Sequence, residues 1–77
     1  THTLIISITD DNRLWLDGVA GPMEEVVRSA VRRAQDGNTP VAVNGDRRAD
    51  LGIAVELLSR LRQANIQSVS FRVSEQP

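Results

Sequence analysis

The spacing of apolar residues along this chain switches between the two-residue repeat of a strand and the roughly 3.6-residue repeat of a helix, and no other feature constrains its fold as strongly. The order of segments is β, β, α, β, α, β. This order predicts an α+β two-layer sandwich with a mixed sheet, formed by residues 1–77 as one domain. The strand-like segments are residues 3–9, 13–17, 41–43 and 68–74, and the helix-like segments are residues 22–34 and 51–64.

The first two strand-like segments predict a hairpin. The polar residues 10–12 separate them, and such residues favour turns. In the second segment Leu14 and Leu16 point to one side and Trp15 to the other. Residues 18–21 are expected to end that strand.

Both helical segments have one apolar face. Pro22 suits the first turn of the first helix, which is expected to end at residues 36–38. Asp50 can cap the second helix, and Asn65, a residue that tolerates the left-handed conformation, follows its end. The first stripe is Met23, Val26, Val27, Ala30, Val31 and Ala34. The second stripe, expected to pack deeply, is Leu51, Ala54, Val55, Leu58 and Leu61, widened by Ile53 and Leu57.

Strand–helix–strand crossovers are almost always right-handed, so both helices are expected on one face of the sheet. The other face is then open. Ile5 and Trp15 are expected on that open face, where they are candidates for an interaction surface. A lone tryptophan in a small domain is more often part of the core, so a core role for Trp15 also stays open.

The size and charge of the chain narrow its function. Its 77 residues contain no cysteine, so neither a large core nor disulfides stabilise it, and association with another chain is expected. A formal net charge of −1 argues against binding nucleic acid. No apolar run is long enough to span a membrane. Because the sequence starts at Thr1 without a methionine, it reads as a segment of a longer protein, and a targeting or anchoring segment upstream is one alternative that stays open.

The sequence offers little chemistry for catalysis. His2 is the only histidine, and it has no accompanying set of metal ligands. No serine is placed as an activated nucleophile, and the chain has no lysine to complete a phosphate-binding loop. We therefore expect no enzyme activity, no metal and no cofactor.

The densest polar stretch, residues 44–50, lies between a strand and a helix start. Ligands of open α/β sheets gather at such positions, and Arg47 and Arg48 could bind an anionic group. The simpler interpretation is that both arginines are solvated, that Asp46 fixes a turn which closes the preceding strand, and that Asp50 caps the helix.

Several motifs together resemble the periplasmic C-terminal domain of the ExbD/TolR family. The resemblance covers nearly the whole chain. Its motifs are Asn12–Gly18, Met23–Val26, Val41–Asp46, Leu51–Gly52, Val55–Leu58, Leu61–Ile66 and Val69–Phe71.

The resemblance implies the periplasmic domain of a single-pass inner-membrane protein, in a complex that uses the proton-motive force. It implies a homodimer that works with an ExbB/TolQ-like proton-channel subunit and binds a TonB/TolA-like transducer or, in the TolR branch, peptidoglycan. A rival hypothesis is a small dimeric metabolite-sensing α/β domain, which requires a concave pocket near residues 45–50.

Overall fold

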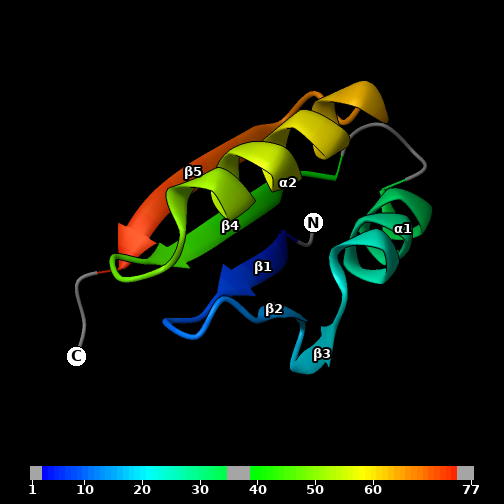
Figure 1. Cartoon of the computed structure of the whole chain (residues 1–77). Helices are drawn as coiled ribbons and strands as arrows, with labels where there is room; N and C mark the ends of the chain where they lie inside the picture. Colours follow the sequence, from blue (N-terminus) through cyan, green and yellow to red (C-terminus); the bar gives the residue numbers. More distant parts are fainter. Residues whose placement is uncertain (1–2, 35–38, 75–77) are drawn as a thin grey trace.

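The computed structural model describes residues 3–34 and 39–74 and contains a five-stranded sheet and two helices (Figure 1). Its elements are β1 (Leu4–Ile8), β2 (Leu14–Leu16), β3 (Val19–Gly21), α1 (Met23–Arg33), β4 (Val41–Asp46), α2 (Leu51–Gln63) and β5 (Val69–Ser74).

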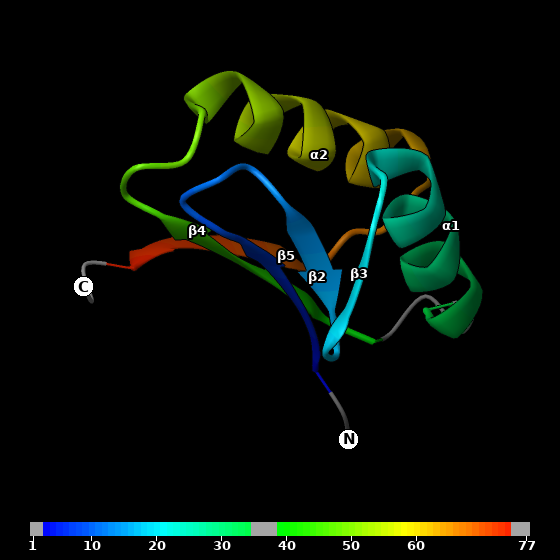
Figure 2. The ribbon, with the colours of Figure 1, turned by 60° about the horizontal axis from the view of Figure 1, so that its bottom comes forward.

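The strands lie in the order β3-β2-β1-β4-β5. β1, β4 and β5 run parallel, whereas β2 and β3 are antiparallel to their neighbours, so the sheet is mixed. Both helices lie on the same face, with α1 near β2 and β3 and α2 over the β4 side (Figure 2). The predicted α+β fold with helices on one face is therefore confirmed.

The strand β3 was missed by the sequence prediction, which ended the second strand at residues 18–21. Val19–Gly21 instead folds back on β2, with Val19 opposite Leu16. The turn consists of Asp17 and Gly18, whose φ angles are 51° and 86°. Asp-Gly in this conformation forms the two-residue turn that suits a tight hairpin, so the chain reverses where the prediction ended the strand.

The strand β4 is longer than predicted, because Asn44, Gly45 and Asp46 continue it. Gly45 pairs with Ile8 on one side and with Val73 on the other. Pairing on both sides overrides the turn preference of this sequence. A Cβ atom at Gly45 would lie only 3.3 Å from Cζ of Phe71, so the absent side chain allows the aromatic ring to cover the strand.

The core lies between the sheet and the two helices. Alternate residues of β1, β2 and β4 point into it, and small or branched residues of the helices fill it from the other side. The buried hydrophobic residues are Leu4, Ile6, Ile8, Leu14, Leu16, Val26, Ala30, Ala34, Val41, Val43, Ala54, Leu57, Leu61 and Ile66.

The predicted deep packing of the α2 stripe is wrong for two of its residues. Leu51 is 71% exposed and Val55 is 58% exposed. The buried face of α2 is centred on Ala54, Leu57 and Leu61. Helical geometry places Leu51 and Val55 on a flank of α2, outside this buried face. In α1 the expected end at residues 36–38 lies outside the described residues.

Candidate interaction surfaces

The open face of the sheet carries Ile5 and Trp15. Because Leu4, Ile6 and Ile8 point toward the helices, Ile5 points away from them, and its side chain is 44% exposed. Trp15 lies on the same open face, since Leu14 and Leu16 on either side of it in β2 are buried.

Trp15 belongs to a row that crosses the open face. It pairs with Ser7, Ser7 pairs with Asn44, and Asn44 pairs with Arg72. Trp15 is half-buried, and its indole Nε1 is buried without a hydrogen-bond partner among the described residues. This row offers one aromatic side chain beside polar ones, which is a surface suited to contact with another molecule.

The loop between β4 and α2 has a fixed backbone and exposed arginine side chains. The N–H of Arg48 donates to Oδ1 of Asp46 at 2.8 Å, and the N–H of Arg47 donates to the carbonyl of Ser74 at 3.1 Å. Oδ1 of Asp50 accepts from the N–H of Gly52 at 2.8 Å, which makes it the N-cap of α2. Within residues 3–34 and 39–74, neither arginine forms an ion pair.

At the other end of α2 the chain leaves through Asn65, whose φ is 66°. The N–H of Asn65 donates to the carbonyl of Arg62 at 2.9 Å, and the N–H of Ile66 donates to the carbonyl of Leu61 at 3.2 Å. These two bonds form a Schellman motif, which returns the buried Ile66 to the core. The structure therefore places Asp46, Asp50 and Asn65 at positions that shape the backbone.

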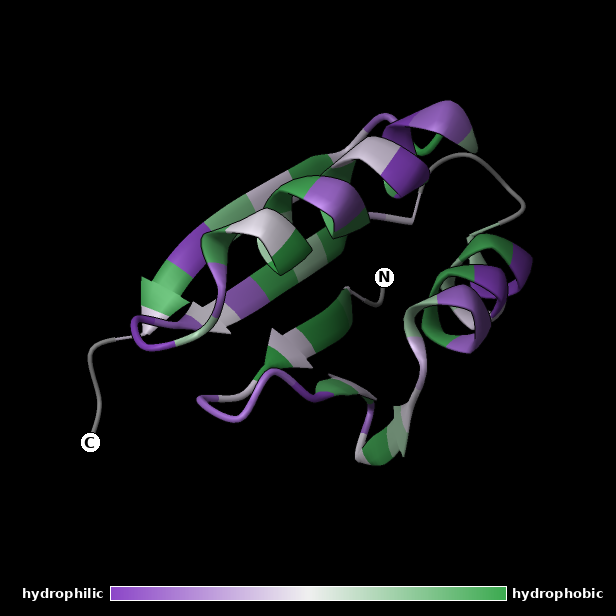
Figure 3. Ribbon diagram, in the orientation of Figure 1, coloured by the Kyte–Doolittle hydropathy of each residue, from purple (hydrophilic) through white to green (hydrophobic). Residues whose placement is uncertain are grey.

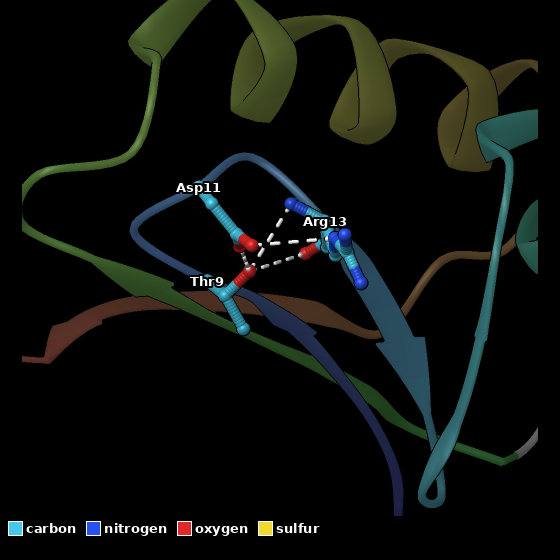
Figure 4. A network of polar contacts seen from close by, with 3 residues as sticks. All are labelled: Thr9, Asp11 and Arg13. Carbon is cyan, nitrogen blue, oxygen red and sulfur yellow. Dashed lines mark hydrogen bonds and ion pairs between the residues drawn. The ribbon is translucent and has the colours of Figure 1, made fainter.

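The tip of the β1–β2 hairpin holds a polar network (Figure 4). Oγ1 of Thr9 donates to Oδ1 of Asp11, and Nε of Arg13 lies 3.2 Å from Oδ2 of Asp11. The hydrogen bond from Thr9 lowers the pKa of Asp11 below its usual value, with a smaller effect from the charge of Arg13. This network connects the residues on both sides of the turn.

The contact made by Asn12 was not predicted from the sequence. Its φ is 67°, and its Oδ1 accepts a hydrogen bond of 2.7 Å from the N–H of Asp50. This bond ties the hairpin tip to the start of α2. The left-handed turn could have been expected of an asparagine, but a contact between residues so far apart in the chain leaves no local signal.

A second surface that sequence analysis missed lies along the β5 edge of the molecule. We call it the edge strip, and it consists of Leu51, Val55, Phe71 and Val73, the last two being 39% and 54% exposed. Sequence reasoning assigned the two α2 residues to the core stripe, and the alternation along β5 identified one apolar face without showing that this face is exposed. Apolar and polar residues alternate along β5 in Figure 3.

A hollow of about 440 Å³ lies beside the start of α1. None of residues 45–50, where the metabolite-sensing hypothesis requires a pocket, belongs to its lining. The lining residues are Asn12, Arg13, Leu14, Ala20, Gly21, Pro22, Met23 and Ile53.

Among the residues that the structure describes, no group of three or more histidine, cysteine or acidic side chains is arranged to hold a metal ion. Neither α1 nor α2 is long and apolar enough to cross a bilayer.

Residues 1–76 match the family model described as biopolymer transport protein ExbD/TolR. The chain belongs to the ExbD/TolR family. The resemblance found in its sequence is thereby confirmed. No curated protein gives a significant match to this ExbD/TolR chain.

Membership of the ExbD/TolR family indicates a general role, location and set of partners. ExbD/TolR proteins have an energy-transduction role in biopolymer transport, and the family is non-enzymatic. They are associated with the inner membrane and generally work with ExbB/TolQ and TonB/TolA partners.

Proposed function

We propose that this chain is a non-enzymatic periplasmic interaction domain that forms a homodimer and docks a TonB/TolA-like transducer next to an ExbB/TolQ-like proton channel. One observation carries the proposal beyond family membership. The helices cover a single face of the sheet, and the uncovered face holds the half-exposed Ile5 beside the only tryptophan. Such a face is stabilised when another polypeptide covers it.

The open face fits contact between two copies of the chain. Ile5 of β1 lies opposite Ala42 of β4. Because the alanine side chain is small, the side chain of Ile5 projects beyond it. Trp15 lies across from Ser7 and supplies a broad aromatic surface. A twofold contact would remove both apolar side chains from water, with the polar row at its rim.

The dimer can be tested by replacing Ile5 with glutamate. In light scattering during size-exclusion chromatography, the unchanged chain is expected to be a dimer and Ile5→Glu a monomer, because the charge would be buried in the contact. Val19→Glu, at an exposed valine on the β3 edge, is the matched control and is expected to remain dimeric. A monomeric unchanged chain at millimolar concentration would contradict the proposal.

Docking and location need the full-length protein in its membrane. A photo-crosslinking amino acid at position 15 is expected to capture a second copy. We further propose that the chain follows a transmembrane helix with one aspartate, as the family implies, and sequencing of the encoding gene tests this. Co-sedimentation with purified peptidoglycan distinguishes a TolR-like role from transducer docking.

A further inference from the structure

We propose that the hollow beside the start of α1, which we name the α1 hollow, binds a bulky apolar side chain that a partner protein presents between basic residues. The proposal rests on the proposed docking function, and it specifies one docking position and the chemistry of the partner there. Leu14, Met23 and Ile53 line the α1 hollow and pack in or against the core. The hollow therefore lies on the helix-covered side of the sheet, away from the open face assigned to the dimer.

Three parts of the chain that are distant in sequence form the α1 hollow. The β1–β2 hairpin contributes residues 12–14, the end of β3 and the start of α1 contribute residues 20–23, and α2 contributes Ile53. In Figure 2 the tip of this hairpin lies below α2, and the start of α1 lies beside both. A partner side chain that enters here would contact all three parts at once.

The lining of the α1 hollow is mostly apolar. Leu14 is buried, and Met23 and Ile53 are only partly buried, so apolar surface remains open to water. The volume of about 440 Å³ lies near the lower end of the range of ligand sites, about 300 to 1,000 Å³. This volume fits one or two large side chains, and burying an apolar side chain here removes it from water.

Hydrogen bonds hold the walls of the α1 hollow in place. Oδ1 of Asn12 accepts a bond of 2.7 Å from the N–H of Asp50, which joins the hairpin wall to the start of α2. The N–H groups of Glu25 and Val26 both donate to the carbonyl of Pro22 at 3.0 Å, which fixes the α1 wall. A site that exists before binding loses less conformational entropy when a partner binds.

The rim of the α1 hollow is negatively charged. Arg13 is the charged member of the lining, and its Nε lies 3.2 Å from Oδ2 of Asp11, so this pair is neutral as a whole. Asp10 next to this pair, Glu24 in the first turn of α1 and Asp50 at the start of α2 are exposed. None of these three carboxylates forms an ion pair with a described residue. Basic groups on a partner would therefore be attracted to this rim.

The charges of the β4–α2 loop do not reverse the sign of the rim. Arg47 lies beside the end of β5, because its N–H donates to the carbonyl of Ser74, and Asp46 and Arg48 carry opposite charges. Contact between the α1 hollows of two copies would bring two acidic rims together, which is unfavourable. A basic partner is therefore favoured over a second copy of this chain.

The test titrates the isotopically labelled 77-residue chain with three five-residue peptides and follows its backbone amides by NMR. The peptides are Lys-Lys-Phe-Lys-Lys, Lys-Lys-Ala-Lys-Lys and Glu-Glu-Phe-Glu-Glu, each with blocked ends. The first is expected to bind at least about ten times more tightly than either control, and more weakly as salt rises. Its largest shifts are expected at Leu14, Met23 and Ile53. Equal binding of either control, or no binding of any peptide, would overturn the proposal.

Chain variants locate the site. Met23→Lys should abolish binding of the Lys-Lys-Phe-Lys-Lys peptide, because it adds a positive charge to the α1 hollow, while the carbon stem of lysine still covers the neighbouring apolar surface. Met23→Leu should keep the binding. Val73→Lys makes the same charge change at an exposed valine of β5, the strand at one edge of the sheet, and should leave binding unchanged. Unchanged binding by Met23→Lys would refute the location.

A variant confined to exposed carboxylates tests the role of the rim. Asp10→Asn combined with Glu24→Gln should weaken binding of the Lys-Lys-Phe-Lys-Lys peptide about threefold and reduce its salt dependence. Both residues are exposed, so the fold is expected to stay intact. Unchanged affinity and salt dependence would show that the acidic rim does not select the partner.

Light scattering separates this inference from the proposed dimer. Met23→Lys is expected to remain dimeric, and Ile5→Glu is expected to bind the Lys-Lys-Phe-Lys-Lys peptide as a monomer. If Met23→Lys instead dissociates the dimer, the α1 hollow is a contact between copies and this inference fails, while the dimer itself stands. If no peptide binds and Ile5→Glu alone dissociates the dimer, the inference fails and the proposed function is retained.

Discussion

Replacing Asn12 should weaken the connection between the hairpin tip and α2. Two variants separate the effect of losing its hydrogen bond from the effect of its backbone conformation. In Asn12→Gly the positive φ of 67° is kept, but the 2.7 Å hydrogen bond to the N–H of Asp50 is lost. A hydrogen bond of this kind contributes about 1 kcal/mol, and the added backbone freedom of glycine costs about 0.5 kcal/mol more. Asn12→Gly should therefore lower the free energy of unfolding by roughly 1.5 kcal/mol.

Asn12→Ala loses the same hydrogen bond and also replaces asparagine, whose short polar side chain tolerates the left-handed region, by a residue that lacks this tolerance. The left-handed conformation costs alanine about 1 kcal/mol or more. Asn12→Ala should therefore destabilise the chain by roughly 2 to 3 kcal/mol. The corresponding decrease in Tm is at least about 8 °C for a domain of this size.

Urea unfolding followed by the fluorescence of Trp15 measures both variants, and Asp10→Ala, at an exposed position in the same turn, is the control. If Asn12→Gly is as stable as the unchanged chain, the hydrogen bond does not stabilise the fold. If alanine and glycine are equivalent, the argument from backbone strain is wrong.

Gly45→Ala should destabilise the fold by about 1 to 3 kcal/mol, because its Cβ atom would press on the Phe71 ring at 3.3 Å; the double variant Gly45→Ala with Phe71→Leu should recover part of that loss in urea unfolding. No recovery would show that the cost has another source. The pKa of Asp11 is lower in the folded chain, so its stabilising effect is present above the usual value of 3.8 and is lost as the pH falls through the folded pKa. Thermal unfolding of Asp11→Asn should therefore approach that of the unchanged chain in acid, and a difference that does not depend on pH would contradict this.

The sequence predicted the layers and the order of all elements except β3, because these follow from the period of the apolar residues and from the handedness of crossovers. It did not predict the rotation of α2. A helix whose apolar residues cover much more than one narrow stripe does not reveal which of them the sheet covers, and Val55 was assigned to the core for this reason. Which side of α2 the sheet covers depends on the packing of the whole domain.

Local preferences were also outweighed by pairing at two positions. Asn44 and Gly45 are typical turn residues, yet strands on both sides hold them in β4. Val19 begins a strand too short to show a period, and only its pairing with Leu16 identifies it. The open face could be predicted because successive residues of a strand point to opposite faces of the sheet. The exposed β5 edge could not, because it depends on which strand ends the sheet.

The central position of β1 determines how the fold carries mechanical load. The first strand in sequence lies in the middle of the sheet, parallel to β4, while the last strand, β5, runs in the same direction at the edge. Tension applied between Leu4 and Ser74 would pull these strands lengthwise past one another, so their backbone hydrogen bonds would be loaded in shear and would have to break together. The chain should therefore resist stretching far better than a hairpin that opens one bond at a time.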